Sequence, residues 1–201
     1  MDGVIFQPAY FWKEVHTIFG TEKEGKELAV YLHEDYAMLV QEVMKLWKGK
    51  DAAPYFALVH SIKYIKGVKE VFDFCKKNDL QTAIISASSI DLARRVQRDF
   101  GIDHIYANEL VIKDNKVTGE FIWPIGAGKE KKAEIIRHLC QDLGIPRREV
   151  VYIGDDEIDI EAFQEAGTSI AFNSKSGKLN EIATYVVEGE DLRKVLRLLK
   201  S

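Results

Sequence analysis

Four acidic side chains follow a short apolar run in the last third of the chain. The apolar residues 150–153 and Gly154 lead directly into the carboxylates of Asp155, Asp156, Glu157 and Asp159. The run predicts a buried parallel strand, and an open α/β sheet binds its ligands at the carboxyl end of such strands. Carboxylates this close repel one another and resist joint ionisation. A hard divalent cation among them is the simplest explanation.

The same acids also fit the start of a helix. Asp155 or Asp156 would then be the N-cap, and the remaining carboxylates would be stabilised by the helix dipole. Crowded acids occur more often at functional sites than elsewhere. We therefore favour the cation site.

Two further sets of residues could bind an anion. Ser86 ends the apolar run 80–85, where it could donate a hydrogen bond to a ligand or cap the following helix. Lys129, Lys131 and Lys132 stand where a helix is predicted to begin, and any of them could instead be a solvated surface charge.

The elements that position these residues alternate between strand and helix from residue 81 onward. Strands are predicted at 80–86, 104–107, 150–153, 168–172 and 185–187. Helices are predicted at 89–100, 131–143, 160–166 and 191–200. A hairpin is predicted around Asp114–Asn115. This order predicts an α/β fold with a doubly wound parallel sheet.

Residues 8–64 show only helical periodicity. We expect shorter helices at 10–19 and 52–64 and one long helix between them, with an apolar stripe of Leu28, Leu32, Leu39, Val43, Leu46 and Trp47. A βαβ crossover needs roughly 30 residues, so this segment is an insertion that could cover the sheet edge. The predicted division is a core of residues 1–7 and 65–201, a helical cap of residues 8–64, and a β-hairpin flap at 109–122.

Composition excludes several classes of protein. The chain has 201 residues and a net charge of −4, with no basic patch for nucleic acid or a membrane surface. Cys75 and Cys140 lie in amphipathic patterns and are predicted to be free thiols, which favours a cytoplasmic location. No secretion signal, membrane span or closely spaced histidine pair is visible.

The ordered set of motifs resembles the haloacid-dehalogenase superfamily of phosphatases. The set comprises Asp2-Gly3-Val4, the strand-ending Ser86, a lysine at a helix start, and Gly154-Asp155 with Asp159. Residues 106–120 resemble the hairpin of the phosphoserine-phosphatase-like branch. The resemblance implies a Rossmann-like core, a helical cap and a magnesium-dependent hydrolysis of a small phosphorylated metabolite through an aspartyl-phosphate.

The resemblance also implies a role for each residue. Ser86 and Lys132 would hold the phosphoryl group, Lys132 being preferred for its spacing of 23 positions from Asp155. Asp155 would bind Mg²⁺ directly and Asp159 through water. Asp2 would be the general acid and base, with its carbonyl also on the metal.

One departure from the family concerns the nucleophile. The attacking aspartate of the family lies two residues before the general acid, which is the position just before Met1. The family also has an apolar strand leading into that motif. We therefore expect the natural protein to begin upstream and the 201-residue form to be impaired in turnover.

The substrate and the rival functions stay open. Val4 and Gln7 replace residues usual in the phosphoserine branch, and the cap is rich in aromatics, so a different small phosphomonoester is as well supported as phosphoserine. The main alternative is a catalytically silent protein of the same fold that binds a phosphorylated ligand or partner. A receiver domain is a weaker alternative, and the sequence does not fix the oligomeric state.

Overall fold

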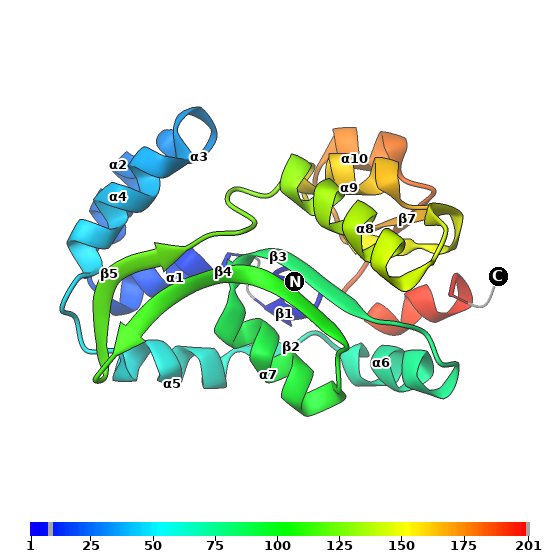
Figure 1. Ribbon diagram of the computed structural model, residues 1–201, viewed down its shortest axis with the longest axis horizontal. Coiled ribbons are helices and arrows are strands. Elements are labelled where there is room, and N and C mark those ends of the chain that lie inside the picture. The colour runs from blue at the N-terminus through cyan, green and yellow to red at the C-terminus, as the bar shows by residue number, and fades with distance from the viewer. Residues whose placement is uncertain (8–9, 200–201) are drawn as a thin grey trace.

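The computed structural model describes residues 1–7 and 10–199 and contains two three-stranded sheets (Figure 1). The first consists of β3 (Ala83–Ser89), β4 (His104–Lys113) and β5 (Lys116–Ile122). The second consists of β6 (Val151–Gly154), β7 (Thr168–Phe172) and β8 (Tyr185–Val187). Within these two sheets, neighbouring strands are parallel except β4 and β5. The α/β class with parallel strands is confirmed.

Helices connect the strands and cover the sheets. They are α6 (Val68–Lys77), α7 (Ile90–Phe100), α8 (Glu130–Leu143), α9 (Ile160–Glu165) and α10 (Gly177–Ile182). Short 3-10 turns lie at Arg147–Glu149, Glu157–Asp159 and Leu192–Arg197. In Figure 1, α6 and α7 run along one side of β3–β5, while α8, α9 and α10 gather around β6–β8.

The segment predicted as a cap is helical throughout most of its length. Its helices are α1 (Phe11–Ile18), α2 (Glu22–Leu28), α3 (Tyr31–Glu34), α4 (Tyr36–Trp47) and α5 (Ala53–Ser61). It is flanked by two short antiparallel strands, β1 (Phe6–Gln7) and β2 (Lys63–Tyr64). Figure 1 shows α2, α3 and α4 standing apart from the core at the far end of β5.

The prediction of one long helix in this segment is wrong. The apolar stripe is divided among α2, α3 and α4. The break between α3 and α4 arises because Asp35 leaves helical geometry, with φ −150° and ψ 85°. Its side chain accepts a hydrogen bond from the backbone N–H of Met38 at 2.9 Å and so caps α4. The helical period survives the break, which is why the pattern alone did not reveal it.

The hairpin of β4 and β5 pairs residues across the range 109–122. Asp114 and Asn115 both have positive φ, 50° and 58°, as a two-residue hairpin turn requires. The paired strands reach back to Glu109 and Ile122. Val117 is buried and Gly49 donates its backbone N–H to the Val117 carbonyl, so the hairpin packs against the end of α4.

The C-terminal segment is a 3-10 turn rather than the expected α-helix. Leu192 and Val195 are buried, and the turn packs against α6. The predicted end of that helix at Lys200, and the predicted start of the cap at Pro8, lie outside the described residues. In the described ranges no helix is both long and apolar enough to cross a membrane.

Candidate active site

A groove separates β3 from β6. Each of these strands has one neighbouring strand within the described residues, β4 and β7 respectively. Residues 83–86 and 151–153 line the two sides of one large cavity, with Leu139 of α8 and Val71 of α6 between them. The cavity measures about 1840 Å³, more than a small-metabolite pocket, because it joins the groove to the space beneath the helical segment.

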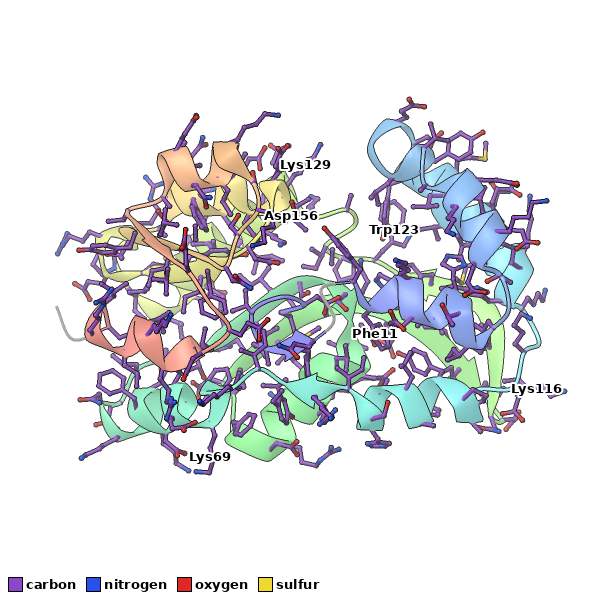
Figure 2. All side chains as sticks on the ribbon, turned by 180° about the vertical axis from the view of Figure 1, so that it is seen from behind. Phe11, Lys69, Lys116, Trp123, Lys129 and Asp156 are labelled. Atoms are coloured by element: carbon purple, nitrogen blue, oxygen red, sulfur yellow. The ribbon has the colours of Figure 1, made fainter. Side chains whose placement is uncertain are left out.

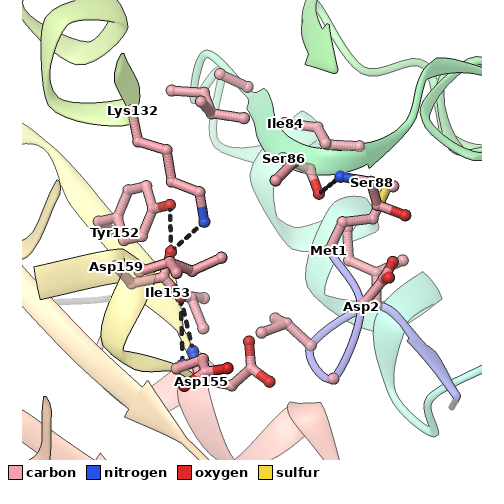
Figure 3. Close-up of a pocket in the computed structure, with 18 of the residues that line it drawn as sticks. Met1, Asp2, Ile84, Ser86, Ser88, Lys132, Tyr152, Ile153, Asp155 and Asp159 are labelled. Atoms are coloured by element: carbon pink, nitrogen blue, oxygen red, sulfur yellow. Dashed lines mark hydrogen bonds and ion pairs between the residues drawn. The ribbon is translucent and has the colours of Figure 1, made fainter. Parts of the chain in front are cut away.

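Ser86 lies at the carboxyl end of the groove on the β3 side (Figure 3). It is 5 % exposed, and its Oγ accepts a hydrogen bond from the backbone N–H of Ser88 at 3.2 Å. The hydroxyl hydrogen of Ser86 is therefore available to the cavity. Ser89, not Ser86, caps α7, since its side chain accepts from the N–H of Asp91.

Lys132 faces Ser86 from the other side of the cavity (Figure 3). Its Nζ lies 2.6 Å from Asp159 Oδ1, and both side chains are almost fully buried. Lys131 is exposed and pairs with Glu134, and Lys129 is exposed at the helix start. Of the three candidate lysines, Lys132 alone combines burial with a place in the groove, and its catalytic role stays a prediction.

Asp159 is surrounded by hydrogen-bond donors. Besides Lys132, the hydroxyl of Tyr152 donates to Oδ1 at 2.9 Å and the backbone N–H of Asp155 donates to Oδ2 at 3.1 Å. Burial raises the pKa of Asp159, but the Lys132 ammonium outweighs it and holds the pKa below its usual value. The side chain is therefore a charged carboxylate that orients Lys132, and the predicted water-mediated contact with a metal stays a prediction.

Asp155 lies over the turn that contains Gly3. A Cβ atom on Gly3 would come within 2.0 Å of Asp155 Oδ2, and Gly3 has a φ of 74° that side-chain-bearing residues rarely adopt. Burial raises the pKa of Asp155 to about 7, although the amino group of Met1 and Lys132 lower it. The close approach places a partly desolvated carboxylate against the turn that follows Asp2.

Asp2 has one satisfied oxygen and one orphaned oxygen. Its Oδ2 accepts the backbone N–H of Phe11 at 2.9 Å, which ties the first turn to α1. Its Oδ1 is buried and has no well-formed hydrogen bond in the described residues, although the Ser88 hydroxyl, also without one, lies close enough to the carboxyl group to lower its pKa. Burial raises the pKa of Asp2 as well. A buried carboxylate oxygen without a partner is costly, so this atom calls for a proton or a cation.

These observations fit a magnesium ion, although no cluster of three acidic, histidine or cysteine side chains is preformed in the described part of the chain. Mg²⁺ takes one or two carboxylates and keeps several waters. Asp155 and the Asp2 region offer such a donor set, with an orphaned oxygen and a carboxylate of raised pKa.

Sequence reasoning missed Asn108 and Tyr152. Asn108 is fully buried at the end of the parallel part of β4, and its Nδ2 donates to the carbonyls of Ala87 and Gly126, both at 2.9 Å. Its Oδ1 accepts from the N–H groups of Ile125 and Gly126. Asn108 thus joins the end of β3 to the loop before Lys132. Its signal was the same as that of Ser86, a polar residue directly after an apolar strand.

The fold is an α/β core whose cavity is lined by a buried lysine, a buried serine and several carboxylates. The model of the haloacid dehalogenase-like hydrolases matches residues 7–164, and the chain belongs to this family. The fold prediction of a core with an inserted cap agrees with its structural relatives, and the chain is an enzyme of the phosphatase class.

Similar proteins are phosphoserine phosphatases by name. That of Methanocaldococcus jannaschii is 28 % identical over 184 residues, covering 90 % of this chain and 86 % of its own. That of Saccharomyces cerevisiae is 29 % identical over 185 residues, covering 90 % of this chain and 59 % of its own. A substrate-bound phosphoserine phosphatase structure superposes with a TM-score of 0.86 at 25 % identity, covering 99 % of this chain and 95 % of its own.

Proposed function

We propose that the chain carries the site of a magnesium-dependent phosphomonoester hydrolase that acts on a small phosphorylated metabolite in the cytoplasm. The observation that carries this proposal is the convergence of Asp2, Ser86, Lys132 and Asp155 on one cavity. Lys132 and the hydroxyl of Ser86 neutralise and bind the phosphoryl oxygens. Mg²⁺, when bound at Asp155 and the Asp2 carbonyl, adds Lewis-acid stabilisation of the same oxygens.

Asp2 is proposed as the general acid and base. Its raised pKa lets it hold a proton for the leaving oxygen and then take one from the attacking water. The contact of Oδ2 with the Phe11 N–H fixes the carboxyl group at the start of α1.

The attacking carboxylate is proposed to come from an extended segment that occupies the groove between β3 and β6. Such a segment, running parallel to both strands and into Met1, would complete the hydrogen bonding of both edges. An aspartate directly before Met1 would then form the aspartyl-phosphate, and water would hydrolyse it with the help of Asp2. We propose that the 201-residue chain alone turns over poorly.

The test compares three proteins in a magnesium-dependent phosphate-release assay on a panel of small phosphomonoesters. The first is the 201-residue chain, the second carries five apolar residues and an aspartate before Met1, and the third carries the same extension ending in asparagine. Turnover is expected only from the aspartate form, and it should be lost on chelation and in Asp155→Asn.

Equal turnover in all three proteins would refute the groove-derived nucleophile. If no form turns over but the 201-residue chain binds inorganic phosphate through Lys132, the catalytically silent phosphate-binding function is supported instead. Loss of binding in Lys132→Met would identify that site, and Lys131→Met is the exposed control.

A further inference from the structure

The cavity above Ser86 and Lys132 has a largely apolar roof. One face of α4 contributes Tyr36, Leu39, Val40 and Val43, and the same cavity is lined by Trp12 of α1 and Phe121 of β5. Apart from Val43, which is buried, these side chains are only half-buried. Trp12, Leu39, Val40 and Phe121 pack against the core with part of their surface, and the part that remains accessible in the cavity can contact a ligand.

The polar atoms of the roof are already bound within the protein. Trp12 donates its Nε1–H to the carbonyl of Ala87 at 2.9 Å, which holds the indole one residue beyond Ser86. The hydroxyl of Tyr36 accepts from Asn108 Nδ2 at 3.3 Å. Both rings are therefore held by their polar ends. What they offer to the cavity is carbon surface.

The Nδ1 atom of His16 is also bound within the protein. Its Nδ1 is bound to Thr21, 2.8 Å from the hydroxyl, and its ring meets Gly25 so closely that a Cβ there would lie 2.7 Å from Nδ1. The ring edge packs on Trp47 at 4.8 Å between centroids. This imidazole is part of the packing between α1, α2 and α4. The described arrangement uses its Nδ1 for an internal bond.

Charged side chains of the helical segment lie at the margin of the roof. Lys13, Glu22 and Lys26 line the cavity but are exposed. An amino-acid leaving group brings an ammonium and a carboxylate, and each needs a fixed partner once it leaves water. The roof next to Trp12 and Tyr36 supplies apolar contact instead.

We infer that the substrate's leaving group is an apolar or aromatic alcohol rather than an amino acid. This inference rests on the proposed phosphatase function and names the substrate class of the same site. Apolar pockets discriminate by about 10-fold or more for each methylene gained. A ligand with an aryl group should therefore bind at least tenfold more tightly than a zwitterion of similar size.

The experiment measures binding, so it needs no turnover. Titration calorimetry on the 201-residue chain with Mg²⁺ compares benzylphosphonate, 2-amino-4-phosphonobutyrate (the phosphonate analogue of phosphoserine) and inorganic phosphate. Benzylphosphonate is expected to bind at least tenfold more tightly than the amino-acid analogue. Equal or tighter binding of the amino-acid analogue, with phosphate also bound, would overturn the inference and leave the proposed function standing. Failure of all three to bind would overturn both.

A matched pair of variants locates the effect. Val40→Thr keeps the shape of a roof side chain and adds a hydroxyl, and it should weaken benzylphosphonate several-fold while phosphate binding is unchanged. Val30→Thr makes the same change at an exposed residue outside the cavity and should change neither affinity. An unchanged benzylphosphonate affinity in Val40→Thr would overturn the assignment of the roof.

Discussion

Two pairs of ionisable groups in the site, Lys132 with Asp159 and Asp2 with Asp155, differ in how their hydrogen bonds are satisfied. Lys132 and Asp159 are buried together at 2.6 Å, and Tyr152 and backbone N–H groups complete the bonding of the carboxylate. Asp2 and Asp155 are also desolvated, yet the Oδ1 atom of Asp2 has no partner among the described residues. The first pair is finished by the protein itself. The second pair needs a bound cation or a proton to be satisfied. This difference distinguishes a pair that positions side chains from a binding site.

The largest effect that tests this contrast is expected at Lys132. Lys132→Met leaves the buried Asp159 charge without its cation, which should cost roughly 3–5 kcal/mol of unfolding free energy. Urea denaturation measures it. The double variant Lys132→Met with Asp159→Asn should recover part of the loss, because the stranded charge is removed. A loss of unfolding free energy below about 1 kcal/mol would mean that Asp159 does not depend on Lys132 to compensate its charge.

Removing the charge of Asp155 should stabilise the folded chain, whereas removing that of Lys132 should destabilise it. The pKa of Asp155 is about 7 in the folded chain, against about 3.9 for an unfolded aspartate. Between pH 4 and 7 the folded state binds more protons, so stability falls as the pH rises through this window. Asp155→Asn should be more stable than the parent by about 4 kcal/mol above pH 7 and equal to it near pH 4.

Magnesium binding provides a control for the prediction about Asp155→Asn. The ion should raise the melting temperature of the parent chain above pH 7, because it binds only the folded carboxylates, and it should leave Asp155→Asn unchanged. Glu157→Gln, at an exposed residue paired with Lys178, should keep the magnesium response. If the stability of the parent chain did not change from pH 4 to 8, the Asp155 carboxylate would not be unsatisfied in the folded state.

The close approach of Gly3 to Asp155 gives a smaller effect. Gly3→Ala adds a Cβ both at positive φ and against Asp155 Oδ2, which should cost about 2–3 kcal/mol. Gly20 has a similar φ of 65° with open space around it, so Gly20→Ala isolates the backbone cost of about 1 kcal/mol. Equal losses in thermal unfolding would show that Asp155 moves aside freely.

The smallest effect is expected at Tyr152. Tyr152→Phe removes one donor to Asp159 but leaves Lys132 and the backbone N–H groups in place, so the loss should be about 1.5 kcal/mol. Denaturant unfolding measures it. The magnesium-induced shift should be retained, since the hydroxyl serves the first pair only. Loss of that shift would show that the two pairs are coupled through Asp159.

The amino-acid pattern predicted which segments form strands, because side-chain polarity and its period depend on residues that are close in sequence. Both the run before Gly154 and the segment 168–172 form parallel strands, as predicted. Burial was predicted correctly for residues 169–172 only: Val151 is exposed and Tyr152 and Ile153 are half-buried, because β6 has a neighbouring strand on one side and borders the groove on the other. The long helix was wrong at Asp35, where a side-chain cap breaks the chain without breaking the helical period. Local patterns record which face is buried, and they record caps only weakly.

The sequence by itself determined which residue types stand at the ends of the strands, because strand and turn propensities act between near neighbours. Only the tertiary structure decided which of three lysines is buried against Asp159, that Ser89 and not Ser86 caps α7, and that Asn108 joins β3 to the loop before Lys132. Each of these depends on side chains separated by many residues in the chain or on the exact end of a strand. Distances and burial across such separations arise when the elements pack, and no local pattern encodes them.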